Sequence, residues 1–244
     1  MKIALCLHGY FDSQRDANSK GLDGFNHIKK HILDGNNVDI FIHSWDLPNK
    51  EKIISLYENW IIDAAFEEQI DFVPLCRENG LDHRTLDSGR THFKNVFSQF
   101  YSVQRAFELM LESGLQYDCV IKARFDLGRI NRLTSGPQSP QNPYPVQCIN
   151  FDPTLPMDKF YMADWQYFET EGPADMWFYS SQENMEAFAG IYDALKADLR
   201  IDSPFEEWAG PNDGGMMNSI KALKWFFIQN GLWDKKQPLN TTWE

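Results

Sequence analysis

The segment Tyr117-Asp-Cys-Val-Ile-Lys-Ala-Arg-Phe-Asp-Leu-Gly128 decides how we interpret this chain. Its apolar centre, with Val120 and Ile121, is typical of a buried β-strand. Arg124 and Asp126 follow where the strand should leave its sheet, and in open α/β sheets ligands bind beyond the carboxyl ends of the strands. A guanidinium matches phosphate geometry, and a carboxylate can hold Mg²⁺ or Mn²⁺ that the phosphate already chelates. The segment therefore indicates a phosphate and metal site, with a plain ion pair at the sheet rim as the alternative.

Length and charge limit the classes of protein that fit. A chain of 244 residues can bury a substantial core, as one large α/β domain or one domain with a small appendage. With 23 basic and 35 acidic residues the formal charge is -12, which repels nucleic-acid backbones and anionic membranes. The longest basic clusters, Lys29-Lys30-His31 and Lys235-Lys236, are short enough to be solvated surface charges. We therefore expect no nucleic-acid partner.

The cysteine spacing and the amino-terminal residues indicate in which cellular compartment the protein works. Cysteines occur at positions 6, 76, 119 and 148 without C-x-x-C spacing, which favours neither a zinc knuckle nor a redox pair. The apolar run within Met1 to His8 is too short for a signal peptide, and no run of about 18 uncharged apolar residues follows. We expect a soluble, cytoplasmic protein without a transmembrane segment, which could still act on a membrane-held acceptor.

Hydrophobic periodicity predicts a β-α-β unit at the amino terminus. Its parts are a strand over Lys2 to His8 that ends at Gly9, a helix from Phe25 to Leu33, and a second strand over Val38 to Ile42. The polar loop between them, Tyr10 to Lys20, has a length that is often functional at a strand end.

The rest of the chain continues this α/β pattern. From Gly136 to Pro156 six prolines indicate a loop over the active face or an interdomain linker. The predicted elements are a helix over 49–57, a third strand over 70–74, a long amphipathic helix over 95–113, an edge strand over 146–149, a strand over 175–179, a helix opened by Ser180-Ser-Gln-Glu183, and a last helix through 217–227.

Unusual polar residues follow three of the expected strands. They are His8-Gly9, His43-Ser-Trp-Asp46 and Arg124-Phe-Asp126, and parallel strands would bring them to one rim. Gly9 admits close backbone approach, Trp45 offers a surface to a base or sugar, and Asp46 could accept hydrogen bonds from hydroxyls. The alternative for His8 and His43 is that they are satisfied strand-end histidines.

The sequence resembles the nucleotide-sugar glycosyltransferases of the GT-A fold, in particular small transferase-like proteins found with polysaccharide and lipopolysaccharide synthesis genes in bacteria and large viruses. The similar segments are Lys2 to Gly9, Val38 to Asp46, Ser98 to Ala106, Tyr117 to Leu127 and Asp175 to Asn184. The resemblance implies a single GT-A-like α/β domain over 1–244, with a mostly parallel sheet and helices on both sides. Residues 1–130 would form the nucleotide-binding half and residues 131–244 the acceptor-side half.

The resemblance also implies a reaction, the transfer of a sugar from a nucleoside-diphosphate sugar to a glycan or glycolipid acceptor. The family's D-x-D metal motif would fall at Arg124-Phe-Asp126, where arginine replaces the first aspartate. Asp126 is then the expected ligand of Mn²⁺ or Mg²⁺. If Arg124 neutralises the diphosphate directly, the metal becomes dispensable.

Two further basic residues extend the expected phosphate site. GT-A enzymes often place a basic residue on the helix before this strand, where Arg105 shares a helical stripe with Ser98 and Ser102. Lys122 should lie on the same side of the strand as Arg124 because side chains alternate along a strand. The alternatives are a solvent-facing stripe for Arg105 and a structural ion pair for Lys122.

Three aspartates are candidates for the catalytic base that an inverting transferase needs. Asp164 lies in the aromatic run Tyr161 to Phe168, which could stack on acceptor sugars, and Asp175 begins an expected strand. Asp213 stands in a glycine turn suited to a second metal contact. Each of them could instead be a helix cap or turn carboxylate.

Two other functions stay open. A nucleotidyltransferase acting on a sugar phosphate would use similar phosphate and metal chemistry, although no G-x-x-x-x-G-K-[ST] loop is present. A catalytically silent carbohydrate-binding or assembly protein would have kept the fold and lost the first metal carboxylate. Hydrolysis of a sugar nucleotide would separate an enzyme from a binding protein.

Overall fold

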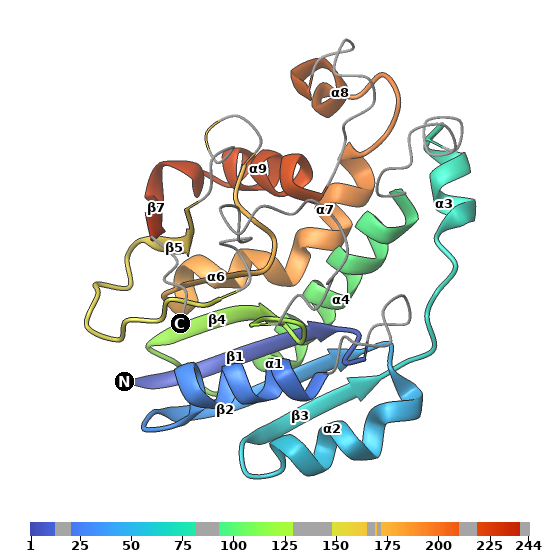
Figure 1. The fold of residues 1–244 in the computed structure, drawn as a ribbon. Helices are drawn as coiled ribbons and strands as arrows, with labels where there is room; N and C mark the ends of the chain where they lie inside the picture. Colours follow the sequence, from blue (N-terminus) through green and yellow to red (C-terminus); the bar gives the residue numbers. More distant parts are fainter. Residues whose placement is uncertain are drawn as a thin grey trace, which may run out of the picture.

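The computed structural model describes residues 1–12, 21–81, 93–128, 148–164, 169, 172–209 and 219–239. Its strands form one seven-stranded sheet in the order β3-β2-β1-β4-β6-β5-β7 (Figure 1). The strands are β1 (Lys2–Gly9), β2 (Asn37–Ser44), β3 (Ile61–Phe66), β4 (Cys119–Arg124), β5 (Phe160–Ala163), β6 (Trp177–Ser180) and β7 (Lys236–Leu239).

Most strand pairs are parallel, as the sequence predicted. β1 pairs in parallel with β2 and β4, β2 with β3, and β5 with β7. Only β6 runs antiparallel to its neighbours β4 and β5. The carboxyl ends of β1, β2, β3 and β4 therefore meet at the same edge of the sheet.

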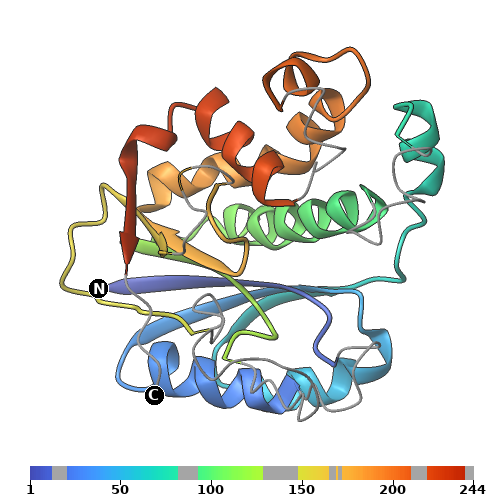
Figure 2. The same cartoon turned by 45° about the horizontal axis from the view of Figure 1, so that its top comes forward.

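Helices cover both faces of the sheet, which confirms the predicted α/β class. Figure 2 shows α1 and α2 on one side of the sheet and α4, α7 and α9 on the other. The α-helices are α1 (Gly21–Ile28), α2 (Lys50–Tyr57), α3 (Val73–Glu78), α4 (Phe93–Glu112), α6 (Gln182–Met185), α7 (Ile191–Asp198), α8 (Pro204–Ala209) and α9 (Ser219–Gln229). Shorter helical turns are η1 (Lys29–Leu33), η2 (Leu47–Asn49), η5 (Glu186–Gly190) and η6 (Trp233–Lys235). Within the described ranges, no helix combines the length and apolarity needed to cross a bilayer.

Alternation along β1 divides its side chains between two hydrophobic cores. Ala4 and Cys6 join the core under α4, whereas Ile3, Leu5 and Leu7 join the core under α1 and α2. This period of two is the reason that consecutive residues at the strand ends face different layers.

Gly24 of α1 fixes how the chain leaves β4. A Cβ atom at Gly24 would lie 1.8 Å from the backbone oxygen of Phe125, so only glycine lets the helix pack this close. Phe125 and Leu127 are buried in the core on the α1 side. Arg124 and Asp126 are consequently left for the α4 side.

The predicted third strand over 70–74 is wrong. The strand lies earlier, at Ile61–Phe66, on the edge of the sheet, where its residues are half exposed and so lack a strong apolar pattern. Val73 and Pro74 instead begin α3, because proline fits the first turn of a helix, where no hydrogen bond from its nitrogen is needed.

Several carboxyl-terminal predictions also need correction. The strand predicted at 175–179 lies at Trp177–Ser180, and Ser181 rather than Ser180 caps α6, accepting from the backbone nitrogen of Asn184 at 3.4 Å. The helix that follows is interrupted by η5 before α7 begins. The sequence patterns predicted neither β5 nor β7, both short. The edge strand predicted over 146–149 lies partly outside the described residues, and its last two positions are not in a strand.

Candidate functional site

A pocket of about 360 Å³ opens at the carboxyl edge of the sheet, beside the first turns of α4. This volume is within the range of small-molecule sites. Its lining residues are His8 and Gly9 at the end of β1, Tyr10 and Phe11 after it, Trp45 after β2, Gln69 after β3, Asn95, Ser98, Gln99 and Ser102 on α4, and Arg124 and Asp126 at the end of β4.

The predicted meeting of strand ends at one rim is confirmed. His8 is the register partner of His43 on β2 and of Arg124 on β4. In-register residues of neighbouring strands face the same side, so these three basic side chains form a row across the sheet. The row faces α4, because the residues two positions earlier, Cys6 and Phe41, belong to the core on that side.

Arg124 is held in place by two carboxylates. Its Nε donates to Asp126 Oδ1 at 2.9 Å and its Nη2 to Asp126 Oδ2 at 2.7 Å, while Nη1 lies 3.7 Å from Asp175 Oδ1. The carboxylates, with Asp126 contributing most, raise the pKa of Arg124 above its ordinary value. About a third of the side chain, 32%, is exposed at the pocket. The ion pair that the sequence left as an alternative therefore exists, and it lines the pocket.

Asp175 is a mostly buried carboxylate, with 15% of its side chain exposed, and it already accepts hydrogen bonds from two side chains. Its Oδ2 accepts from Gln99 Nε2 at 2.8 Å and from Ser219 Oγ at 2.7 Å. Burial acts to raise the pKa of Asp175, but Arg124, Lys122 and these hydrogen bonds outweigh it and leave the pKa below its ordinary value. Such a carboxylate is a weak proton acceptor, so this geometry suits a group that positions Arg124 better than a base.

Lys122 extends the basic row beneath the pocket floor. Its ammonium group donates to the backbone oxygen of Asp175 and is buried, with 2% of the residue exposed. Burial lowers the pKa of Lys122 to about 7, with Arg124 acting in the same direction. Lys122 thus faces the same side as Arg124, as predicted, but it is not among the lining residues of the pocket.

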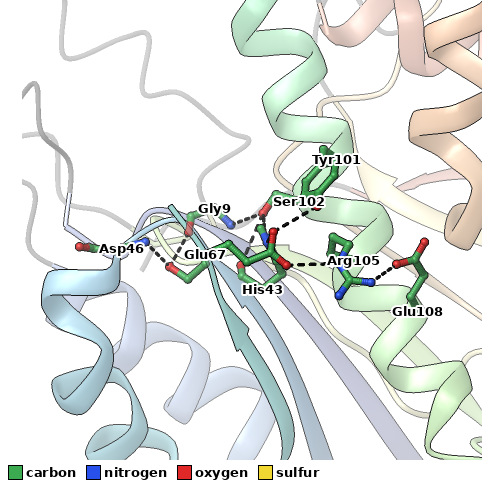
Figure 3. Close-up of polar contacts among 9 residues, drawn as sticks. Gly9, His43, Asp46, Glu67, Tyr101, Ser102, Arg105 and Glu108 are labelled. Atoms are coloured by element: carbon green, nitrogen blue, oxygen red, sulfur yellow. Dashed lines mark hydrogen bonds and ion pairs between the residues drawn. The ribbon is translucent and has the colours of Figure 1, made fainter. Parts of the chain in front are cut away.

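A hydrogen-bonded chain holds the turn at Gly9, as Figure 3 shows. Gly9, at φ +98°, donates its backbone N–H to Ser102 Oγ at 3.1 Å, and its carbonyl accepts from Ser44 Oγ at 2.8 Å. Ser102 Oγ in turn lies 2.7 Å from His43 Nδ1. A Cβ atom at Gly9 would meet nothing within 4 Å, so the backbone there is open to close approach.

His43 connects this series of hydrogen bonds to the acidic residue Glu67. Its Nε2 lies 3.6 Å from Glu67 Oε2, which is too long for a hydrogen bond. Burial lowers the pKa of His43 to about 4 and outweighs the opposite effect of Glu67. His43 is therefore neutral at pH 7, and its Nδ1 can accept a hydrogen bond from the Ser102 hydroxyl.

Arg105 is paired away from the pocket. Its Nη1 donates to Glu108, its Nε lies 3.5 Å from Glu67 Oε1, and the Glu108 hydrogen bond is the main cause that raises its pKa. The hydroxyl of Tyr101 also donates to Glu67, at 3.1 Å (Figure 3). Arg105 shares α4 with Ser98 and Ser102, but unlike them it does not line the pocket.

His8 and Trp45 line the pocket, and each carries buried polar atoms that lack a partner among the described residues. Both ring nitrogens of His8 and Nε1 of Trp45 are buried without a hydrogen bond among the described residues. Burial, assisted by Lys122, Arg124 and His43, lowers the pKa of His8 well below its ordinary value, so the ring is neutral. One face of Trp45 stacks on Tyr101, with ring centroids 5.2 Å apart.

Two further expected site residues, Asp46 and Asp164, do not line the pocket, and one lies outside the described residues. Asp46 holds the loops instead: its oxygens accept from Asn49 Nδ2 at 3.0 Å and from the backbone of Asp12 at 3.1 Å. Asp164 is exposed at the end of β5, and its backbone N–H donates to Leu239. Asp213 lies outside the described residues.

The described residues offer a cation one carboxylate at the pocket, that of Asp126. Both of its oxygens accept hydrogen bonds from Arg124. In the described ranges, no group of three or more His, Cys, Asp or Glu side chains could hold a metal ion. This donor set fits a Mg²⁺ or Mn²⁺ ion that arrives with phosphate and water ligands, and it does not fit an ion held by protein groups alone.

Sequence reasoning missed several residues around the pocket. Asn95 and Gln99 complete a polar stripe with Ser98 and Ser102, at positions i, i+3, i+4 and i+7 on one side of the amphipathic helix α4. That spacing was a usable signal. Glu67 and Gln69 were missed because they follow β3, which the sequence pattern misplaced.

Comparison with solved structures finds proteins that are distantly similar to this chain in structure. The fold is similar to the crystal structure of mouse xyloside xylosyltransferase 1 in its apo form, with 12% identity, 99% of this chain and 85% of that chain covered, and a TM-score of 0.41. A transferase carrying two cysteine-to-serine substitutions has 10% identity, 98% and 91% coverage and a TM-score of 0.38. No protein-family model matches the sequence, and the comparison with curated protein sequences gives no match. At these values no residue or activity is carried over, and the function must be argued from the pocket itself.

Proposed function

We propose that this protein transfers a sugar from a nucleoside-diphosphate sugar to a glycan or glycolipid acceptor. The observation that carries the proposal is the guanidinium of Arg124, fixed by Asp126 and Asp175 at the carboxyl edge of a mostly parallel sheet. Ligands of open α/β sheets bind at this edge. The GT-A resemblance of the sequence supports the same reaction.

In this mechanism Arg124 stabilises the diphosphate as it leaves. Charge develops on the phosphate oxygens when the glycosidic bond breaks, and a cation already oriented by hydrogen bonds needs no reorganisation at that moment. Asp126 and Asp175 supply that orientation. Gly9 would let the ligand approach the backbone, because no described atom fills the space above its Cα.

Deprotonation of the acceptor needs a group other than Asp175. Its low pKa and its hydrogen bonds to Gln99 and Ser219 make it a positioning residue in this proposal. Asp213 stays a predicted candidate for the base, whereas Asp164 is exposed outside the pocket and could act only on an acceptor that extends to the end of β5. A retaining reaction would instead use the leaving phosphate to accept the proton.

A catalytically silent binding protein is the second candidate. It is favoured by one observation, that both carboxylates close to the pocket floor, Asp126 and Asp175, are committed to Arg124. A pocket of this kind can bind a nucleotide sugar without activating an acceptor. Binding without donor hydrolysis would identify this case.

The proposal is tested by ligand stabilisation followed by turnover. Thermal unfolding is measured with UDP, GDP and CDP, and a ligand at 100 times its dissociation constant should add about 2.7 kcal/mol to the free energy of unfolding. The matching nucleotide sugars are then assayed for release of the diphosphate, with and without glycan acceptors. Stabilisation without release supports the silent protein, and pyrophosphate release from a nucleoside triphosphate and a sugar phosphate would support a nucleotidyltransferase instead. Absence of any stabilisation would reject the proposal.

Metal use is tested at Asp126. When bound, Mn²⁺ or Mg²⁺ would neutralise charge on the diphosphate. Asp126→Asn keeps one acceptor oxygen for Arg124 but removes the charge, so we expect at least a tenfold loss of metal-stimulated diphosphate release while metal-free nucleotide binding largely survives. Release is titrated against Mn²⁺ from an EDTA baseline, with circular dichroism as the folding control. Equal wild-type activity with and without EDTA would contradict the metal role.

A further inference from the structure

Two residues of the pocket, His8 at the end of β1 and Trp45 after β2, carry buried polar atoms that the protein leaves unsatisfied. His8 is 2% exposed and Trp45 5% exposed, yet neither ring nitrogen of His8, nor Nε1 of Trp45, has a hydrogen-bond partner among the described residues. Leaving a buried polar group unpaired is costly, and native proteins satisfy most of them with protein, water or ligand. Both residues line the pocket, and a ligand there can supply the missing partners once the rings turn their buried nitrogens toward it.

The donor and acceptor atoms of a neutral imidazole limit which ligand groups can be the missing partner. A neutral histidine carries one N–H donor and one lone-pair acceptor. A phosphate oxygen can only accept, so it satisfies one nitrogen and leaves the other unpaired. Hydroxyl groups both donate and accept, and therefore match both nitrogens of His8. Trp45 adds one further donor, which an oxygen of the same ligand can accept.

The charged residues around His8 indicate which part of the pocket would bind phosphate and which part would bind uncharged groups. Its register neighbour Arg124 lines the pocket and carries the exposed guanidinium, whereas Lys122 donates to a backbone oxygen beneath the floor. On the other side, Arg105 is paired with Glu67 and Glu108. A diphosphate is thus drawn to Arg124, and the uncharged part of the ligand is left for His8.

We propose that His8, together with Trp45, binds hydroxyl groups of a sugar ring at the part of the pocket formed by the ends of β1 and β2, beside the diphosphate held by Arg124. This inference rests on the proposed function and states which part of the nucleotide sugar each end takes. The ring is either the ribose of the nucleotide or the transferred sugar, since both present neighbouring hydroxyls. Because His8 is nearly dehydrated, hydrogen bonds made there are stronger than at an exposed site.

The decisive variant is His8→Leu, which replaces the unpaired imidazole with an apolar side chain. Without ligand, the melting temperature should stay the same or rise, because an unsatisfied polar group is removed from the floor. Affinity for a hydroxyl-bearing ligand should fall by roughly tenfold, as expected for the loss of two hydrogen bonds. His8→Asn, whose amide keeps a donor and an acceptor, should recover part of that affinity.

Tyr57→Phe is the matched control. The Tyr57 hydroxyl is likewise buried without a described partner, but it lies in the core on the α1 side of the sheet, away from the pocket. This variant should also keep or raise the melting temperature, and it should leave every affinity unchanged. The pair separates a ligand contact from a general effect of removing unpaired polar atoms.

Calorimetric titrations use four probes: inorganic pyrophosphate, UDP, 2′-deoxy-UDP and UDP-glucose, with the GDP and CDP series if they stabilise the protein more. His8→Leu should weaken hydroxyl-bearing ligands and leave pyrophosphate unchanged. If UDP weakens and 2′-deoxy-UDP is already weak in the wild type, the ribose occupies the site; if only UDP-glucose weakens, the transferred sugar does. Equal weakening of pyrophosphate would overturn the proposal, as would unchanged affinity for all probes, which would mean that water alone satisfies His8.

Failure of the proposed function would look different. In that case no nucleoside diphosphate or nucleotide sugar would bind the wild-type protein. Free glucose, galactose and xylose then serve as probes of the same site at millimolar concentration. Saturable binding that His8→Leu weakens would support hydroxyl recognition in a protein that is not a nucleotide-sugar transferase, and no binding would overturn both proposals.

Discussion

The two faces of the sheet are most different at the carboxyl ends of β1, β2 and β4. On the α1 side the last inward residues are Leu7, Ile42 and Ala123, all fully buried and apolar. One position later, on the α4 side, the same strands present His8, His43 and Arg124. Adjacent residues of one strand therefore have different roles. Those on the α1 side pack in the hydrophobic core, and those on the α4 side are polar residues that core packing does not need.

Because the two faces differ in this way, substitutions on them can test stability and ligand binding separately. Burial of apolar side chains stabilises the fold by about 25 cal/mol per Å², whereas buried polar groups stabilise only when they are paired. Arg124 is paired with carboxylates and His8 is not. Substitutions on the α1 side should change stability alone, and those on the α4 side should change affinity in ways that stability does not follow.

Arg124→Ala should have the largest effect. We expect donor turnover to fall about a thousandfold, because a cation oriented toward a leaving group contributes several kcal/mol to the transition state. Stability should fall as well, since Asp126 and Asp175 lose their counter-charge. The measurement is diphosphate release per folded molecule, with exposed Arg77 of α3 as the control in Arg77→Ala. A large drop in melting temperature with unchanged affinity per folded molecule would make Arg124 purely structural.

Leu7→Ala probes the opposite face at the neighbouring position. Removing this fully buried side chain should lower the free energy of unfolding by about 3 kcal/mol, through lost transfer energy and a cavity. Affinity for the stabilising nucleotide, measured by calorimetry at a temperature where the variant is folded, should be unchanged. An affinity change of tenfold or more would show that the two faces are not independent.

Lys122→Met should raise stability at neutral pH. Because burial lowers the pKa of Lys122 to about 7 from 10.5, the unfolded chain binds one more proton than the folded chain between these pH values. Wild-type stability contributed by this residue therefore rises with pH in that window, and methionine removes the effect. We expect a gain of roughly 2 kcal/mol at pH 7, after the lost hydrogen bond to Asp175, that shrinks towards pH 10. Urea unfolding of both proteins at pH 7 and pH 10 measures this, and a constant difference would show that Lys122 is not desolvated.

Gly9→Ala should have the smallest effect on stability. The residue adopts φ +98°, which an L side chain rarely takes, so we expect a loss of about 1–2 kcal/mol. Gly35→Ala is the matched control, because Gly35 adopts φ +82° and its Cβ would also meet nothing within 4 Å. Urea unfolding should find similar losses, while calorimetry should find weaker nucleotide binding for Gly9→Ala only. Similar affinities would mean that no ligand approaches Gly9.

Strongly periodic segments were predictable from the sequence, and weakly patterned ones were not. The strand with Val120 and Ile121 and the amphipathic helix before it were placed correctly, because long apolar patterns dominate local alternatives. β3 was misplaced because an edge strand exposes much of its surface and carries little alternation. β6 was recognised in part, but its antiparallel direction depends on how the chain returns to the sheet.

The site shows the same limit at the level of single residues. Gly9, Trp45 and Arg124 lie at the predicted rim because parallel strands bring their ends together. No local pattern could show that Asp46 would be used by Asn49 and the loop at Asp12, or that Arg105 would face Glu67. The pairings of Asp46 with Asp12 and of Arg105 with Glu67 join residues far apart in the chain, and even the short-range contact of Asp46 with Asn49 depends on which partner the fold places nearest.

The sequence by itself determined the α/β class, the strands β1, β2 and β4, and the rim at which polar residues follow them. These follow from local periodicity and from the geometry common to all parallel sheets. Only the tertiary structure decided which cations of the site are paired with carboxylates, which carboxylates already accept hydrogen bonds, and which nitrogens lack a hydrogen-bond partner. The reason is physical, since pairing and desolvation depend on distances of a few ångströms between elements that the sequence does not place side by side.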